Sequence, residues 1–204
     1  MSSRATPIPR DCLPPNHAAR SAVLLVSAKV RIEVSAQHVF RTLCDASSWK
    51  HWNSFCPQVD VTYRHGGGHP TERSTGSGGD AVIGEGAQMT LHVRMTPSST
   101  LIQQKVVVTE YSEQIAPTPS TASVGPFRIG WQAQGIPRMM LRADRMTEVE
   151  AVDGAAACEF RTWEGMGGPA SHIVKLMYGN TLQDRFEDWA NDLKEYAEKT
   201  WKGA

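Results

Sequence analysis

Large apolar side chains recur at alternating spacings of four and three residues toward the C-terminus: Leu182, Phe186, Trp189, Leu193 and Tyr196. This is the period of an α-helix that buries one face. Most side chains between them are charged, which is typical of a face in water. Gly168 and Pro169 precede the pattern, and proline is accepted in the first turn of a helix. The spacing therefore predicts one helix from about Pro169 to Trp201, which needs another layer to cover its apolar face.

The sequence before this helix predicts strands and two short helices. Ser35 is a suitable N-cap for a helix over 36–45, and large apolar residues at every third position predict a second short helix within 49–57. Runs rich in β-branched residues, several of them alternating with polar ones, predict seven strands. These runs lie near residues 23–34, 59–64, 88–95, 101–110, 127–133, 139–152 and 156–164.

The composition fits one globular domain. The chain has 204 residues, of which 40% are hydrophobic, which is enough for a single core. Four prolines and no periodicity in the first 20 residues predict a disordered N-terminal arm over 1–20, followed by a folded domain over 21–204. No apolar run is long enough for a transmembrane segment, so we expect a cytoplasmic protein. Asp11 and the prolines of the arm argue against a mitochondrial presequence.

Charge and motif content exclude several classes of partner. The chain has 21 basic and 21 acidic side chains, so no long-range field attracts a nucleic acid or an anionic membrane. The cysteines form no CxxC pair and do not cluster with histidines, and no phosphate-binding or dinucleotide motif occurs. We therefore expect no metal and no cofactor. The glycine-rich loop 66–80 and a second loop over 112–125 are each either disordered or a lid over a site.

Three motifs carry a resemblance to a known superfamily. They are Trp49-x-x-Trp52-x-x-Phe55-x-Pro57, Gly84-x-Gly86 before a central strand, and Phe160-x-Thr162-Trp163-Glu164-x-Met166-x-Gly168 before the long helix. Together with the order of the elements, they resemble the SRPBCC superfamily, also called START-like or helix-grip, over roughly Val23 to Ala197. The last motif looks most like fungal members.

The resemblance implies an α+β helix-grip fold. In this fold a seven-stranded curved antiparallel sheet, two short helices and one long C-terminal helix enclose a cavity for an apolar ligand. The superfamily has no shared catalytic signature, since its members include lipid or hormone carriers and polyketide cyclases or dehydratases. The fold alone therefore does not decide the function.

The Asp153-Gly154 pair predicts the register of the last two strands. This dipeptide suits a two-residue turn that joins Val152 to Ala155. Counting back from the turn places Arg145 opposite Thr162, on the face that also carries the apolar residues of both strands. We therefore expect Arg145 to point inward.

Glu164 lies on the same face in this register, diagonal to Arg145. An isolated charge inside a protein is costly, so the two must either pair with each other or face a polar cavity. In the first case they form a structural ion pair that ties the sheet to the start of the long helix. In the second case Arg145 holds a carboxylate, phenolate or enolate oxygen and Glu164 moves a proton.

Other side chains could complete such a site. His172 and Tyr178 lie in the first turns of the long helix, where Gly179 interrupts the apolar stripe. His172 is a third candidate catalytic residue, or else a surface residue. Trp131 could stack on an aromatic ligand or serve only in core packing. The predicted ligand-binding side chains are Trp131, Phe160, Thr162, Tyr178, Leu182 and Phe186.

Three functions are compatible with these expectations. The first is binding of an apolar or aromatic small molecule, with cofactor-independent polyketide cyclisation or dehydration by Arg145 and Glu164 in secondary metabolism. The second is a non-catalytic carrier of a lipid or a coenzyme-Q-like quinone, which predicts an apolar cavity with the two charges locked in a pair. The third is an interaction module without ligand, which predicts a filled core.

Overall fold

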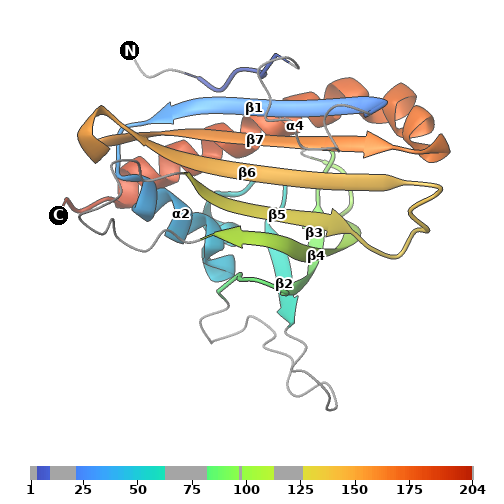
Figure 1. Cartoon of the computed structure of the whole chain (residues 1–204), viewed down its shortest axis with the longest axis horizontal. Helices are drawn as coiled ribbons and strands as arrows, with labels where there is room; N and C mark the ends of the chain where they lie inside the picture. The colour runs from blue at the N-terminus through green and yellow to red at the C-terminus, as the bar shows by residue number, and fades with distance from the viewer. Residues whose placement is uncertain (1–3, 10–21, 63–81, 97, 113–125, 204) are drawn as a thin grey trace, which may run out of the picture.

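The computed structural model describes residues 4–9, 22–62, 82–96, 98–112 and 126–203. Within these ranges, seven antiparallel strands form one curved sheet in the order β1-β7-β6-β5-β4-β3-β2 (Figure 1). All seven predicted strands are present, and the loops predicted over 66–80 and 112–125 lie outside the described residues except for Ser112. The strands are β1 (Leu24–Ile32), β2 (Gln58–Thr62), β3 (Gln88–Val93), β4 (Ile102–Ser112), β5 (Phe127–Ala133), β6 (Arg142–Val152) and β7 (Ala157–Gly167).

Short helices connect β1 to β2. Helix α2 (Ala36–Cys44) begins as predicted, because the Ser35 hydroxyl accepts a hydrogen bond from the backbone N–H of His38 (3.4 Å). A 3₁₀ turn, η2 (Ala46–Ser48), then leads into α3 (Trp49–Trp52).

The helix predicted within 49–57 is real but ends at Trp52. Asn53 leaves the helical conformation, and its side-chain oxygen accepts a hydrogen bond from the backbone N–H of Cys56 (2.7 Å). This local bond replaces the next helical turn. Trp49 and Trp52 pack edge-on against Trp189, with ring centroids 4.9 and 5.7 Å away, so they anchor α3 to the long helix.

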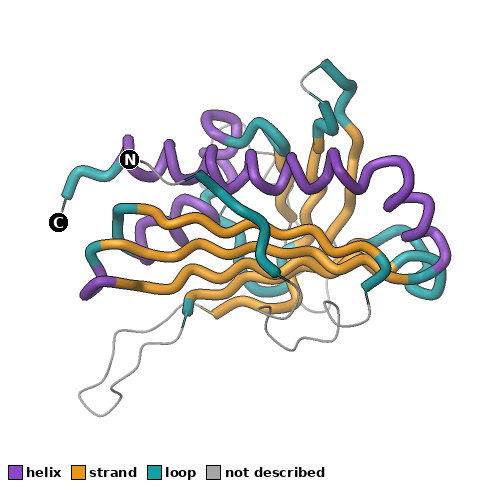
Figure 2. The backbone as a smooth tube through the Cα atoms, turned by 90° about the horizontal axis from the view of Figure 1, so that it is seen from above, coloured by secondary structure: helices purple, strands orange, loops and turns teal. Residues whose placement is uncertain are grey.

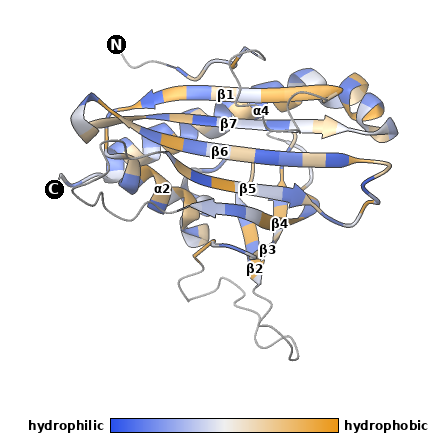
Figure 3. Ribbon diagram, viewed as in Figure 1, coloured by the Kyte–Doolittle hydropathy of each residue, from blue (hydrophilic) through white to orange (hydrophobic). Residues whose placement is uncertain are grey.

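The long helix α4 (Pro169–Thr200) covers the inner face of the sheet and runs along its length (Figures 1 and 2). It packs mainly on β1. Its predicted apolar stripe is confirmed, because Phe186, Trp189 and Leu193 are fully buried. Burial of each contributes about 1.5–3 kcal/mol to the free energy of unfolding. Figure 3 shows hydrophilic and hydrophobic residues alternating along β6, the pattern of a sheet with one covered face.

Gly168 fixes the start of α4 against the β5–β6 loop. Its backbone has φ 92° and ψ 168°, a region that is almost exclusive to glycine. A Cβ atom here would lie 2.6 Å from the carbonyl oxygen of Met140. The same oxygen accepts a hydrogen bond from the backbone N–H of Ala170 (3.0 Å). Only a glycine lets the loop and the helix approach this closely.

The hairpin between β6 and β7 differs from the prediction. Val152 pairs with Ala157 rather than with Ala155, so the loop spans residues 153–156. The chain turns through a short 3₁₀ segment, η3 (Asp153–Ala155), instead of a two-residue turn. The successive residues with positive φ are Asp153 (51°), Gly154 (68°) and Ala155 (73°).

The longer loop shifts the pairing by two residues. Arg145 therefore lies opposite Glu164, and the prediction that it lies opposite Thr162 is wrong. Because side chains alternate between the two faces of a strand, a shift of two residues leaves every side chain on its predicted face. Arg145 and Glu164 still point inward.

The N-terminal residues that the structure describes are ordered. Thr6 pairs with Lys29 through two backbone hydrogen bonds (2.9 and 2.7 Å) at the outer edge of β1. The backbone N–H of Ala5 donates to the side-chain oxygen of Asn191 on α4 (2.8 Å). Residues 4–9 of the predicted arm therefore contact β1 and α4, and the rest of that arm lies outside the described residues.

Candidate functional site

Arg145 is a buried charged side chain on the inner face of the sheet. It projects from β6 and is 4% exposed. Its Nε donates a hydrogen bond to the hydroxyl of Thr162 on β7 (3.1 Å). That hydroxyl donates to the backbone oxygen of Met146 (3.2 Å), so the hydroxyl of Thr147, 3.0 Å away, donates to it. The two threonines thus orient the guanidinium from the sheet side.

Three aromatic rings surround the guanidinium. Its Cζ lies 4.1 Å from the ring centroid of Trp189 and 4.2 Å from that of Phe186, both on α4. Trp131 on β5 lies at 5.2 Å. Each such cation–π contact contributes about 0.5–2 kcal/mol. The guanidinium of Arg145 therefore lies in the interface between the inner face of the sheet and α4.

One nitrogen of this guanidinium lacks a partner. Nη2 of Arg145 is buried and has no hydrogen-bond partner among the residues that the structure describes. Glu164 is directly opposite on β7, yet these two side chains form no ion pair. The structural ion pair that the sequence allows is thus not formed. A buried cation with an unpaired donor is costly, which makes Arg145 a candidate for a functional role.

Glu164 is half-buried on the same face. Burial raises the pKa of its carboxyl group, although the charge of Arg145 opposes the rise. Burial lowers the pKa of Arg145 to about 10, although Glu164 opposes the fall. At neutral pH the guanidinium therefore remains charged, and the carboxyl group keeps its proton to a higher pH than an ordinary glutamate does.

Cys56 interacts electrostatically with Arg145, but it is not an activated nucleophile. Burial raises the pKa of its thiol to about 12, which outweighs the opposite effect of the guanidinium. The Sγ atom donates a weak hydrogen bond to the backbone oxygen of Gln58 (3.4 Å). Since only the thiolate is reactive, this thiol is inert at neutral pH.

The structure brings together some of the predicted site residues and separates others. Trp131, Thr162 and Phe186 contact Arg145, as described above. His172 and Tyr178 are exposed on the first turns of α4, and their side chains make no hydrogen bond within the described part of the chain. Phe160 and Leu182 are buried on β7 and α4, and neither is among the groups in contact with the guanidinium.

Sequence reasoning missed two neighbours of Arg145. Trp189 was predicted only as part of the apolar stripe, although its position three residues after Phe186 places it on the same side of the helix. Thr147 lies two residues after Arg145 on the same strand and therefore on the same face, but no role was predicted for it. No group of three or more His, Cys, Asp or Glu side chains within the described residues could hold a metal ion.

A similar protein comes from a fungus. The chain is 28% identical over 193 residues to the Oxopyrrolidines biosynthesis cluster protein O of Penicillium oxalicum, and the match covers 88% of this chain and 89% of that protein. No protein-family model matches the chain.

Solved structures share the architecture described above. A START superfamily protein from Mycobacterium smegmatis superposes with a TM-score of 0.50 at 16% identity, over 87% of this chain and 99% of that one. The chain has the START-like helix-grip fold. The ZhuI aromatase/cyclase from Streptomyces sp. R1128 shares the helix-grip fold, with a TM-score of 0.57 at 10% identity over 86% of this chain and 93% of that one.

The resemblance noted in the sequence is therefore confirmed at the level of the fold. At these identities the likeness to solved helix-grip proteins does not extend to the roles of single residues. No helix in the described ranges is both long and apolar enough to cross a membrane.

Proposed function

We propose that this protein binds an aromatic or other apolar small molecule that carries an acidic oxygen, between the sheet and α4. The observation that carries the proposal is the buried guanidinium of Arg145, which has three aromatic neighbours and a free Nη2. All three rings are buried, so a ligand would stack on them only after entering between them, and Nη2 would then donate a hydrogen bond to its carboxylate, phenolate or enolate oxygen. A charge-assisted hydrogen bond of this kind contributes about 1.5–3 kcal/mol.

The reaction that suits this pair of groups is cyclisation or dehydration of a polycarbonyl compound. Glu164, as carboxylate, takes a proton from a carbon next to a carbonyl group, and Arg145 stabilises the enolate oxygen that forms. The enolate carbon attacks a second carbonyl of the same substrate, so a carbon–carbon bond forms and the new alkoxide takes the proton back from Glu164. Loss of one water from the product completes a dehydration.

Two comparisons support a role in biosynthesis. The similar protein of Penicillium oxalicum is named for a biosynthesis cluster, and ZhuI is an aromatase/cyclase. Burial shifts the pKa of Glu164 upward from its ordinary value, which is the direction that favours a general base working near neutral pH.

The alternative of a lipid or quinone carrier fits the geometry less well. A carrier with an apolar cavity predicts that the two inward charges neutralise each other. Arg145 and Glu164 form no ion pair, although they occupy directly opposite positions on neighbouring strands. An acidic ligand explains this arrangement and a neutral lipid does not.

The test is to identify what the purified protein retains. The full chain is denatured after purification from a fungal host, and the extract is analysed by mass spectrometry beside extracts of Arg145→Met and Arg128→Met. We expect an aromatic or conjugated acid in the wild type and in Arg128→Met, and its loss from Arg145→Met. A saturated lipid or a neutral quinone retained equally by all three proteins would contradict the proposal.

A further inference from the structure

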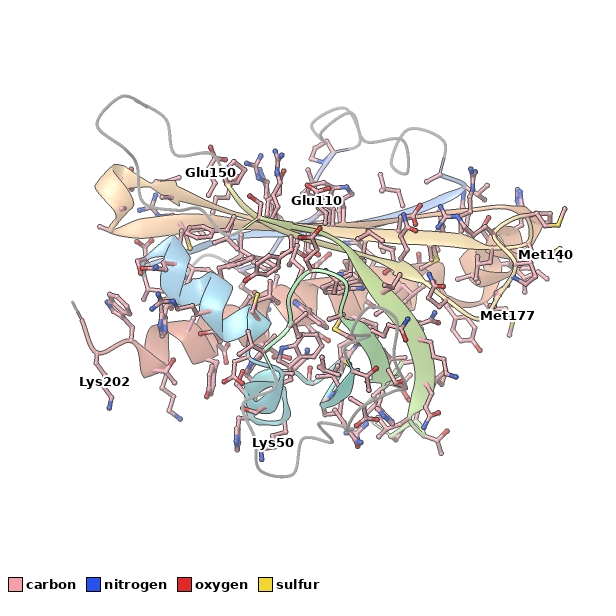
Figure 4. All side chains as sticks on the ribbon, turned by 60° about the horizontal axis from the view of Figure 1, so that its bottom comes forward. Lys50, Glu110, Met140, Glu150, Met177 and Lys202 are labelled. Atoms are coloured by element: carbon pink, nitrogen blue, oxygen red, sulfur yellow. The ribbon has the colours of Figure 1, made fainter. Side chains whose placement is uncertain are left out.

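Exposed apolar side chains gather at the end of the molecule where α4 begins. Met139 is 81% exposed and Leu176 is 88% exposed, although both are large apolar residues. Figure 4 shows the labelled side chains of Met140 and Met177 at this same end. We call this surface the α4-end patch, and its members are Ile136, Met139, Met140, Ile173, Leu176 and Met177.

The two segments that supply the α4-end patch are held together. The β5–β6 loop supplies the first three members, and its Met140 carbonyl oxygen accepts the hydrogen bond from Ala170 at the start of α4 (3.0 Å). Ile173, Leu176 and Met177 follow at helical spacings of three and four residues and are 61%, 88% and 61% exposed. They form a short apolar stripe that faces away from the sheet. Both segments therefore place exposed apolar side chains at the same end of the molecule.

The two stretches of sequence that form the α4-end patch contain only basic charged residues. Neither residues 133–143 nor residues 165–183 contain an aspartate or a glutamate. The same stretches contain Arg138, Arg142 and Lys175, of which Arg138 lies 3.4 Å from Asp144. The chain as a whole is neutral, but at this end its charge is locally positive.

We infer that the α4-end patch docks on the surface of an anionic lipid bilayer. Exposed aliphatic side chains beside lysine and arginine on a helix are typical of segments that lie in the headgroup region. A second copy of this chain is a poor occupant, because its own basic residues would face those of the first. The patch also occupies the protruding first turns of a helix, which suits shallow insertion. The inference does not depend on the ligand proposed at Arg145.

Co-sedimentation with vesicles tests this inference. The full chain is mixed with vesicles of phosphatidylcholine alone, or of phosphatidylcholine with phosphatidylserine. We expect binding to the mixed vesicles, weaker binding to the neutral ones, and a decrease as salt is added. The double variant Leu176→Gln/Met177→Gln is expected to bind at least about tenfold more weakly, because it removes two inserted apolar side chains.

Matched control variants distinguish binding through the α4-end patch from nonspecific adsorption to vesicles. Leu101→Gln/Ile102→Gln changes two exposed apolar residues at the start of β4 and is expected to bind as the wild type does. Lys175→Glu should weaken binding to the anionic vesicles, whereas Lys199→Glu, an exposed position near the other end of α4, should not. Circular dichroism and melting confirm that each variant is folded.

Several outcomes would overturn the inference. Equal binding by the wild type and by the Leu176/Met177 double variant would do so, and so would no binding to either kind of vesicle. Dimerisation that this double variant abolishes would show that a second copy covers the patch. Capture of a purified acidic protein in place of vesicles would show that a protein covers it.

Discussion

Replacing Arg145 by methionine should abolish acid binding without a large loss of stability. The fold depresses the pKa of Arg145 from 12.5 to about 10, which corresponds to about 3 kcal/mol against the charged guanidinium. The hydrogen bond to Thr162 and the three ring contacts together return roughly 2–7 kcal/mol. Methionine keeps most of the apolar contact with the rings. Because methionine keeps much of the ring contact and removes the cost of the buried charge, we expect the free energy of unfolding to fall by less than about 3 kcal/mol.

Binding is measured with two probes of the same shape. These are 2-naphthoate, which carries a carboxylate, and 2-naphthamide, which does not. Quenching of tryptophan fluorescence reports their binding, because Trp131 and Trp189 border the guanidinium. The wild type should bind naphthoate about 10- to 100-fold more tightly than the amide, the equivalent of one charge-assisted hydrogen bond. Arg145→Met should bind the two probes about equally.

Arg128→Met is the matched control for this experiment. Arg128 lies on the outer face, where its Nε is 2.9 Å from the carboxylate of Glu148. Since Glu148 is only 3% exposed, loss of this partner should lower the free energy of unfolding by about 1–3 kcal/mol and leave the probe preference unchanged. The site assignment would be refuted if Arg145→Met lost more than about 3 kcal/mol of stability and kept the preference for naphthoate.

Two further variants test the electrostatics and the backbone. Because burial raises the pKa of Glu164, the wild type should lose stability relative to Glu164→Gln as pH rises above 4.5 toward the raised folded value, in urea unfolding at a series of pH values. A difference that is flat or grows in favour of the wild type would contradict this. Gly168→Ala should lower the melting temperature more than Gly86→Ala, because both have positive φ but only Gly168 has Met140 in the way. The Gly86 variant should lose only about 1–2 kcal/mol, and equal losses would count against the close approach.

The sheet was predictable because its signals are local. Alternation assigns each residue of β6 and β7 to a face, and that assignment holds even though the turn was predicted wrongly. The Asp153-Gly154 pair is compatible both with a two-residue turn and with the longer loop that forms, so the partner of Arg145 was wrong while its direction was right. The residues near Thr6 carry no periodic pattern, because they pair with β1 only through a single bridge to Lys29, and one paired residue imposes no alternation on the sequence.

The surroundings of Arg145 were not predictable in the same way. A long side chain on the inner face can reach either across to Glu164 or up to α4. The choice depends on how closely the helix approaches the sheet, which contacts distant in the sequence determine. One such contact is the close approach of Gly168 to the β5–β6 loop. The aromatic neighbours could still be anticipated from the helix stripe, since Phe186 and Trp189 share one face.

Two buried charged side chains of β6 differ in whether they have a counter-ion. Glu148, on the outer face, has Arg128 at 2.9 Å and Arg161 at 3.8 Å as counter-ions. Arg145, on the inner face of the same strand, is equally buried and has no counter-ion among the described residues. Residues on or next to β6 can therefore supply a counter-ion to a buried charge where the stability of the fold requires one. The acidic ligand proposed above would supply the missing partner only in the complex, so the hydrogen bond to Nη2 would contribute to the free energy of binding and not to that of folding.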